Sequence, residues 1–299
     1  EVYGGTAVSF PKRSMRLSFK NIYGPSTLNH DVFQDGGVSE FDQLLLRPGS
    51  HDAPFWNGAE GDGNYLRNRW VSDRQLEMGH PAPRGEFVHL YLNGVYWGQF
   101  QLMERPNAAF MASHFGGQPE DYDALNRGNP INGDDIAWNQ LLDAIDVSYE
   151  EVQKYLDVEN YADYILLQFY GGNNIDWRSD SNWMAGRRRE PGAGFQFFAW
   201  DSDLIMRIGA DVDIVNFGGP GFLWTRDGGI QQYPEFLKLL AERAQMHLLD
   251  GGIFTDERVM ESINDLAADM RPGIVAETAR WGSGRYTPDT WEAAVQWMT

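Results

Sequence analysis

Side chains with oxygen ligands gather in the middle of the 299-residue chain, and their types suit metal-assisted chemistry. Asp176, Asp180 and Asn182 lie in one polar stretch, and Asp201 and Asp203 follow further along. Mg²⁺ prefers hard oxygen ligands and is often held by one or two carboxylates together with the phosphates of a substrate. Another carboxylate could accept the proton of an attacking hydroxyl. The set therefore indicates metal-assisted group transfer.

The elements expected around these residues follow a defined order. A helical pattern that opens at Asp157 precedes the polar loop 173–182, and two short strands, 183–187 and 195–200, lead directly into Asp201. This is the order of the protein-kinase catalytic segment, in which a loop Asp, an Asn and a later Asp serve the transferred phosphate and its metal. The ordinary kinase signatures, Gly-x-Gly-x-x-Gly, His-Arg-Asp and Asp-Phe-Gly, do not occur in the sequence.

The upstream part contains elements that could complete such a site. Apolar and polar spacing predicts strands at 7–10, 15–20 and 41–47, a helix over 65–78 that stops at Gly79, and strands at 87–92 and 95–100. Asn93-Gly94 joins the last two strands, and Asn-Gly favours a type I′ hairpin turn. Lys12 precedes the strand at 15–20, and the hairpin leads to Glu104.

Beyond Pro106 the pattern becomes mainly helical, with helices expected at 108–115, at 136–145 and from 233 onward. We therefore expect a sheet-rich N-lobe over 1–105 and a helical C-lobe with the catalytic segment over 106–299. The predicted fold class is α+β, a divergent two-lobed protein kinase-like fold with an antiparallel sheet in the N-lobe.

Composition narrows the functional classes. The chain has 43 acidic and 24 basic residues, so its net charge of −19 repels phosphate backbones and makes nucleic acid an unexpected partner. No apolar run of about 18 residues is present, so we expect no membrane span. The absence of cysteine excludes disulfides and thiolate metal sites. Because the sequence opens at Glu1 without a start methionine, we expect a fragment of a longer product whose targeting segment is out of view.

Several motifs resemble the CotH kinase family, which comprises secreted bacterial and spore-coat proteins with a divergent kinase fold. The resemblance runs from about Gly4 to about Trp281. The matching residues are Pro11-Lys12-Arg13-Ser14-Met15-Arg16-Leu17, Leu45-Leu46-Arg47 with Asp52, Leu90-Tyr91-Leu92-Asn93-Gly94-Val95-Tyr96-Trp97-Gly98, Glu104-Arg105, Tyr155-Leu156-Asp157-Val158-Glu159-Asn160-Tyr161, Asn174-Ile175-Asp176-Trp177, Asn182-Trp183 and Trp200-Asp201-Ser202-Asp203.

This resemblance implies an atypical protein kinase that transfers the γ-phosphoryl group of ATP to Ser or Thr hydroxyls of a protein. Mg²⁺ or Mn²⁺ would be the metal, with Ca²⁺ as an alternative cation. The implied partners are a nucleotide and a coat or surface protein as substrate. The implied location is secreted, on the cell surface or associated with spores.

Carried over residue by residue, the resemblance makes Asp201 and Asp203 metal ligands, with Asn182 assisting. The stretch from Asp176 to Asn182 is one residue longer than is usual in relatives. Either Asp176 or Asp180 is therefore the catalytic base.

Lys12 would meet the phosphates and would lie within about 12 Å of Asp201, the reach of a bound triphosphate with its metal. We expect Asp73 to orient Lys12, with Glu77, one helical turn further on, as the alternative. Further residues expected at the nucleotide are Arg16, Arg47 and, at the linker, Glu104.

Two other functions fit parts of the pattern. Asp-x-Asp after a strand also occurs in glycosyltransferases that bind a nucleotide sugar, but these normally place an alternating βαβ domain before the motif. A catalytically inactive kinase-like module for surface binding or adhesion is the second alternative, because a fold does not by itself determine function.

Overall fold

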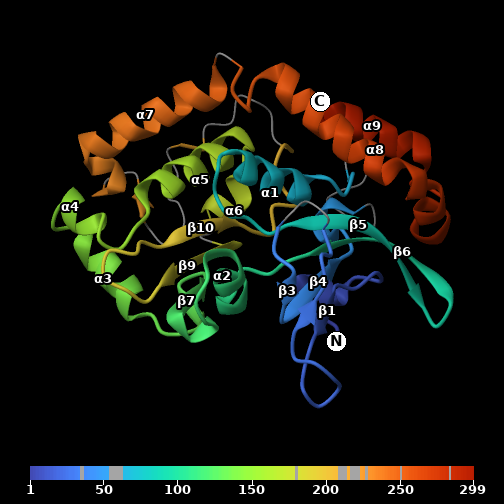
Figure 1. Ribbon diagram of the computed structural model, residues 1–299. Helices are drawn as coiled ribbons and strands as arrows, with labels where there is room; N and C mark the ends of the chain where they lie inside the picture. The colour runs from blue at the N-terminus through green and yellow to red at the C-terminus, as the bar shows by residue number, and fades with distance from the viewer. Residues whose placement is uncertain are drawn as a thin grey trace. The chain divides into compact units, whose positions relative to one another are not determined.

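The structure is a computed structural model (Figure 1) and describes residues 1–33, 37–53, 63–178, 181–207, 214–215, 223–225, 228–249, 251–282 and 284–299. It combines antiparallel sheets with helices, which confirms the predicted α+β class. Contacts divide the chain into two compact units. Unit 1 comprises Glu1–Trp70, Arg84–Arg105 and Asp256–Thr299, and unit 2 comprises Val71–Pro83 and Pro106–Thr255. One boundary between the units lies at Pro106, and the last 44 residues, Asp256–Thr299, group with the N-terminal part of the chain.

Unit 1 contains a four-stranded antiparallel sheet in the order β1-β4-β6-β5. Its strands are β1 (Met15–Ser18), β4 (Gln43–Arg47), β5 (Gly85–Leu92) and β6 (Val95–Met103). Leu44, Leu45 and Leu46 of the inner strand β4 are all buried, which fits a strand covered on both faces. Glu40–Phe41 forms the short strand β3, which pairs with β2 (Leu28–Asn29).

The β5–β6 hairpin has the predicted turn. Asn93 and Gly94 both have positive φ, 51° and 78°, as a type I′ turn requires. The backbone at these two positions favours Asn and Gly because neither suffers the usual steric penalty there.

Two C-terminal helices belong to unit 1, α8 (Asp256–Trp281) and α9 (Pro288–Met298), and they lie side by side (Figure 1). α8 packs on β5 and β6 of the sheet. Its buried residues Ile263, Ala267, Met270 and Ile274 recur at alternating spacings of four and three, which places them on one helical face. A long helix predicted only as part of a helical C-lobe therefore covers the sheet of the N-terminal unit.

Helix α1 (Arg67–Glu77) ends at Gly79, whose φ of 89° only glycine adopts readily, as the sequence predicted. The carboxylate of Asp52 accepts hydrogen bonds from the backbone N–H groups of Asn64 (3.0 Å) and Arg67 (3.1 Å). Asp52 thus satisfies donors at the start of α1 that no helical carbonyl can reach.

Unit 2 contains a second four-stranded antiparallel sheet, in the order β10-β9-β7-β8. Its strands are β7 (Tyr122–Asn126), β8 (Asn129–Asn132), β9 (Trp183–Arg188) and β10 (Gln196–Ala199). The pair β9–β10 was predicted, but β7 and β8 were not. Asp and Asn, which are uncommon in strands, interrupt their apolar residues, and this weakens the strand signal.

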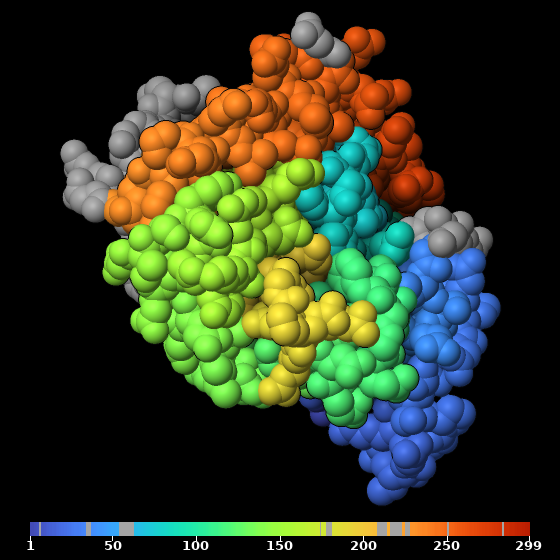
Figure 2. All heavy atoms as spheres, turned by 60° about the vertical axis from the view of Figure 1, so that its left-hand side comes forward, coloured from blue at the N-terminus to red at the C-terminus, as the bar shows by residue number. Residues whose placement is uncertain are grey.

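The helices of unit 2 are α2 (Ala108–Phe115), α3 (Ile136–Ala144), α4 (Tyr149–Val152), α5 (Val158–Tyr170), α6 (Asn174–Arg178) and α7 (Pro234–Leu248). α5 is the central element, because it packs on both β10 and α7 (Figure 1). Its buried Asp163 accepts a hydrogen bond of 2.7 Å from Nε of Arg243 on α7. Figure 2 shows α7, in orange, lying across the yellow-green surface of this part of the chain.

One predicted strand is wrong. Residues 7–10 do not form a strand, because Thr6–Ser9 is a 3₁₀ helix. A short apolar run does not by itself distinguish a strand from a helical turn. Val2, which precedes this 3₁₀ helix, forms an isolated antiparallel β-bridge with Met15 of β1. The edge of β1 therefore pairs with a residue that comes before the 3₁₀ helix.

Candidate functional site

The end of α5 determines where the first candidate carboxylate lies. After Tyr170 the chain turns through Gly171 and Gly172, and the five-residue helix α6 follows. The sequence pattern predicts a loop at Asp176, but this residue lies within α6 and is only 4% exposed.

Two residues that follow α6 in the chain donate hydrogen bonds to the carboxylate of Asp176. Its Oδ1 accepts hydrogen bonds from Nδ2 of Asn182 at 2.8 Å and from Oγ of Ser181 at 3.3 Å. The backbone N–H of Ser181 donates to the carbonyl of Asp176 at 3.0 Å. Asn182 has a positive φ of 56°, a conformation that Asn tolerates better than most residues. The carboxylate and the amide named by the sequence analysis therefore form one hydrogen-bonded pair.

The electrostatic surroundings make Asp176 a weak acid. Burial, and then the negative charge of Asp201, raises its pKa from 3.8 to about 7. Hydrogen bonds from Ser181, Asn182 and Asn173 oppose this rise. A carboxylate with a pKa near neutrality is suited to exchange a proton with a substrate hydroxyl.

Asp201 lies two residues beyond Ala199, the last residue of the buried strand β10, and has a φ of 58°. A left-handed backbone at a residue other than glycine is uncommon, and such conformations concentrate at functional sites. Ser202 and Asp203 are each 1% exposed. Asp203 is therefore an interior residue, whereas Asp201 is half-buried and close enough to Asp176 to raise its pKa.

The other candidate base, Asp180, lies outside the residues that the structure describes. The choice between Asp176 and Asp180 consequently remains a prediction. Asp176 is the one whose surroundings are described, and these surroundings suit a base.

The described donors fit a metal that arrives with a nucleotide. Among the described residues, no cluster of three or more His, Asp or Glu could hold a cation on its own. Asn182 uses its amide nitrogen for Asp176, so its amide oxygen is the atom that could face a cation. Asp201 would supply a carboxylate, and Mg²⁺ commonly completes such a shell with phosphate and water oxygens.

In unit 1, Lys12 is fully buried, with a side-chain exposure of 0%. Its ammonium group donates to the carbonyl oxygen of Gln99 and forms an ion pair of 2.7 Å with Oε1 of Glu277. The ammonium also lies 4.6 Å from the centre of the Phe100 ring and 5.1 Å from that of Tyr65. Burial lowers the pKa of Lys12, and the charge of Glu277 opposes that effect.

Glu277, on α8, receives three donors and is itself fully buried. Besides Lys12, it accepts from the hydroxyl of Tyr65 at 2.9 Å and from the backbone N–H of Gln99 at 2.7 Å. From the sequence we expect Asp73, or else Glu77, to orient Lys12. The ion pair with Glu277 corrects this expectation, because α8 packs on the sheet beside Lys12 and Glu77 pairs with Arg74.

Gly98 makes room for this ion pair. A Cβ atom at Gly98 would lie 2.6 Å from Oε2 of Glu277 and 2.9 Å from Cε of Lys12, and the φ of this residue is 135°. The glycine of the Tyr96-Trp97-Gly98 motif is therefore required both by its backbone conformation and by the close approach of two side chains.

The remaining candidates lie in different surroundings. Arg16 of β1 forms an ion pair with Glu1 and lies 5.0 Å above the ring of Tyr3. Arg47 is buried at the end of β4, and Glu104 is buried and accepts a hydrogen bond of 2.8 Å from the backbone N–H of Arg84. Asp73 lies on the part of α1 that belongs to unit 2.

The sequence matches the family model described as CotH kinase protein over residues 1–299. The chain belongs to the CotH kinase family. No curated protein matches it. Membership, with the antiparallel sheets and helices described above, establishes a divergent two-lobed kinase-like fold. In this member of the CotH kinase family, the described helices include none that combines the length and apolarity needed to cross a bilayer.

Sequence reasoning missed Glu277 and Tyr65 as partners of Lys12. For Glu277 a signal existed, because this glutamate continues the apolar stripe of Met270 and Ile274 at helical spacing. A charged residue on a buried helical face needs a partner, since an unpaired buried charge is costly. That requirement pointed to a buried cation but did not identify Lys12.

Proposed function

We propose that this member of the CotH kinase family transfers the γ-phosphoryl group of ATP to Ser or Thr hydroxyls of a protein. The observation that carries the proposal is the buried carboxyl of Asp176, which is oriented by Asn182 and lies within electrostatic range of Asp201. A base, an amide oxygen and a metal-binding carboxylate are the groups that phosphoryl transfer requires.

In this proposal Asp176 accepts the proton of the substrate hydroxyl. Asp201 and Asn182 would hold Mg²⁺ or Mn²⁺, and Asp203 supports them from the interior. The metal would neutralise negative charge on the phosphates, which matters in a chain of net charge −19. By offsetting the charge of Asp201, it would also lower the pKa of Asp176, so activity would rise with pH through a pKa at or below about 7.

Lys12 would contact the phosphates from unit 1, held by Glu277. Its ammonium has three N–H donors, of which Gln99 and Glu277 take two. The third is the donor proposed for a phosphate, with Arg16, Arg47, Glu104 and Asp73 assigned to the nucleotide on the family resemblance.

The direct test is incubation of the protein with γ-labelled ATP and Mg²⁺ or Mn²⁺, followed by detection of label on the protein or on a candidate coat or surface protein. We expect Asp201→Asn and Asp176→Asn each to lower transfer by at least about a hundredfold, the lower end of what a general base contributes. Asp143→Asn, an exposed carboxylate on α3, is the matched control and should keep full activity. Equal activity in all three variants would contradict the proposal.

A catalytically inactive binding module is the second candidate, and the complete burial of Lys12 favours it. A lysine fully enclosed by Tyr65, Phe100 and Glu277 can serve the core alone. Calorimetry with ATP and Mg²⁺ separates the two candidates, since a module without nucleotide affinity would show no heat of binding. The antiparallel pairing of β1, β4, β6 and β5 gives no support to a nucleotide-sugar glycosyltransferase.

A further inference from the structure

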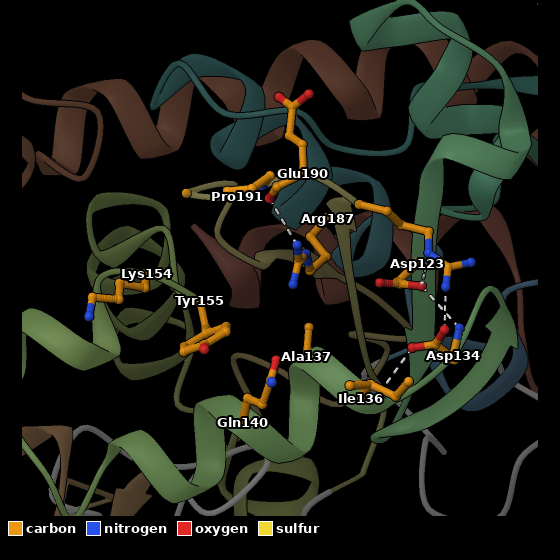
Figure 3. A pocket seen from close by; sticks show the side chains of 12 residues that line it. Asp123, Asp134, Ile136, Ala137, Gln140, Lys154, Tyr155, Arg187, Glu190 and Pro191 are labelled. Atoms are coloured by element: carbon orange, nitrogen blue, oxygen red, sulfur yellow. Dashed lines mark hydrogen bonds and ion pairs between the residues drawn. The ribbon is translucent and has the colours of Figure 1, made fainter.

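A pocket of about 470 Å³ lies in unit 2 at the end of the β9–β10 hairpin that is remote from Asn182 (Figure 3). The two ends of the six-residue strand β9 lie about 17 Å apart, so the pocket is distinct from the candidate site. Its walls come from β7, α3, the segment after α4 and the turn between β9 and β10. Figure 2 shows this turn, in yellow, beside the green surface of unit 2.

Arg187 places a fixed positive charge in the pocket. Its Nε donates to the carbonyl of Arg188 and its Nη2 to the carbonyl of Glu190, each at 3.0 Å. The guanidinium also lies 5.8 Å from the ring centre of Phe195, and it points toward the middle of the pocket in Figure 3. Within the described part of the chain, no carboxylate lies within ion-pair distance of it. Two neutral carbonyls therefore orient Arg187, and the negative charge of Asp123 acts on it at longer range.

The acidic residues of the same pocket are already engaged. Arg189 forms ion pairs with Asp134 and, at 3.4 Å, with Asp123. Asp123 also accepts a hydrogen bond of 2.9 Å from the backbone N–H of Asp134, which in turn accepts one of 3.1 Å from that of Ile136. Glu190, the third acidic residue of the lining, pairs with Arg188 at 3.4 Å. Arg188, Arg189 and backbone donors thus engage the acidic residues, and Arg187 remains the charge that a ligand could use.

Two neutral polar groups face the same space. The hydroxyl of Tyr155 and the side-chain amide of Gln140 have no hydrogen-bond partner among the residues described, and the Gln140 amide points toward Arg187 in Figure 3. Lys154 stands at the rim and pairs with Glu151 on the surface. A ligand would therefore meet one guanidinium, one hydroxyl and one amide around the buried Ala137.

We propose that this pocket binds an anionic side chain, a carboxylate or a phosphorylated hydroxyl, presented by a peptide partner. The outer N–H groups of a guanidinium match two oxygens of such a group. Small-molecule sites usually bury most of their ligand, but Gln140, Arg189 and Glu190 leave this pocket an exposed rim. A side chain on a larger chain suits that shape. The net charge of −19 disfavours binding of an acidic peptide to the rest of the protein surface. The pocket would therefore also determine where such a peptide binds.

The inference does not depend on kinase activity, because binding can be measured without ATP. The probes are four fluorescently labelled short Gly/Ala peptides that differ only at a central Glu, Gln, phosphoserine or Ser, and the readout is fluorescence anisotropy. We expect the Glu or the phosphoserine peptide to bind at least about tenfold more tightly than its neutral counterpart. The ratio of these two affinities identifies which anion the pocket prefers.

Arg187→Gln should abolish this preference. Arg188→Gln is the matched control, because it removes the same charge from the next residue of β9, whose side chain is exposed and does not line the pocket. Tyr155→Phe, which removes only the hydroxyl, should weaken binding of the anionic peptide severalfold. This variant provides the test if Arg187→Gln fails to fold. Equal losses in Arg187→Gln and Arg188→Gln, or no binding of either anionic peptide to the unaltered protein, would overturn the proposal.

Discussion

The carboxyl group of Asp176 combines burial, hydrogen bonds from Ser181 and Asn182, and the nearby negative charge of Asp201. Burial and the like charge favour the protonated acid, whereas the hydrogen bonds favour the ion. The raised pKa shows that burial and repulsion together outweigh the hydrogen bonds. This balance has a consequence for stability as well as for catalysis.

Between pH 4 and 7, folded Asp176 keeps a proton that the unfolded chain releases, so the stability contributed by this residue falls as pH rises. We predict that Asp176→Asn is more stable than the unaltered protein at pH 8, by at most about 4 kcal/mol, the free energy of a pKa change from 3.8 to about 7. The gain should shrink toward pH 4. Urea denaturation at several pH values measures it, with Asp143→Asn as a control that stays flat. A gain that does not vary with pH would show that Asp176 does not titrate in this range.

Among the elements, α8 supplies the counter-ion of the candidate lysine, because it carries Glu277 into the interior of unit 1. The helix lies against β5 and β6, and Gly98 of β6 and Gly273 of α8 permit close approach. At Gly273 a Cβ atom would lie 2.3 Å from Nε2 of the Gln99 side chain, so a larger residue would require that side chain to move. Packing of backbone against side chain thus determines the geometry of the Lys12–Glu277 pair.

We predict that Glu277→Gln lowers the free energy of unfolding by about 3 kcal/mol, because it leaves the buried charge of Lys12 without its counter-ion. Glu261→Gln, on the exposed face of the same helix, should change it by less than about 0.5 kcal/mol. The deficit of Glu277→Gln should diminish at high pH, where Lys12 can lose its proton and become neutral. Guanidinium denaturation at pH 7 and pH 10 tests both statements, and a loss of stability below about 1 kcal/mol would mean that other donors replace the pair.

At the scale of the whole molecule, the proposed function requires groups from both units. Lys12 and Glu277 belong to unit 1, whereas Asp176, Asn182 and Asp201 belong to unit 2. Without a complete set of acidic ligands among the described residues, a metal would depend on phosphate oxygens for the rest of its shell. Metal and nucleotide should consequently bind together.

We predict that Mn²⁺ alone binds weakly and that a non-hydrolysable ATP analogue tightens the binding of Mn²⁺ at least about tenfold. Because this coupling is reciprocal, Mn²⁺ should tighten the binding of the analogue by the same factor. Asp201→Asn should remove this coupling while the protein stays folded, because Asn is nearly isosteric and tolerates the φ of 58°. Calorimetric titrations in both orders measure the coupling. Tight Mn²⁺ binding without the analogue would point to a metal site built by the protein alone.

Local sequence patterns determined much of the fold. Asn93-Gly94 determined the hairpin turn because these residues accept positive φ, and Gly79 marked the end of α1. The order of α5, the β9–β10 pair and Asp201 was also readable, and it led to the α+β prediction and to the family resemblance. Each of these signals depends on backbone conformation or on burial at a short, regular spacing.

Only the tertiary structure decided which distant groups meet. Lys12 and Glu277 are 265 residues apart, and no local pattern relates them. The pKa of Asp176 likewise depends on burial and on the distance to Asp201, which folding alone establishes. Strand β7 pairs with β9 although its own sequence is a weak strand former, because pairing and packing override propensity in a sheet. Contacts of this kind arise from the packing of whole elements, and the spacing of residues along one element does not contain that information.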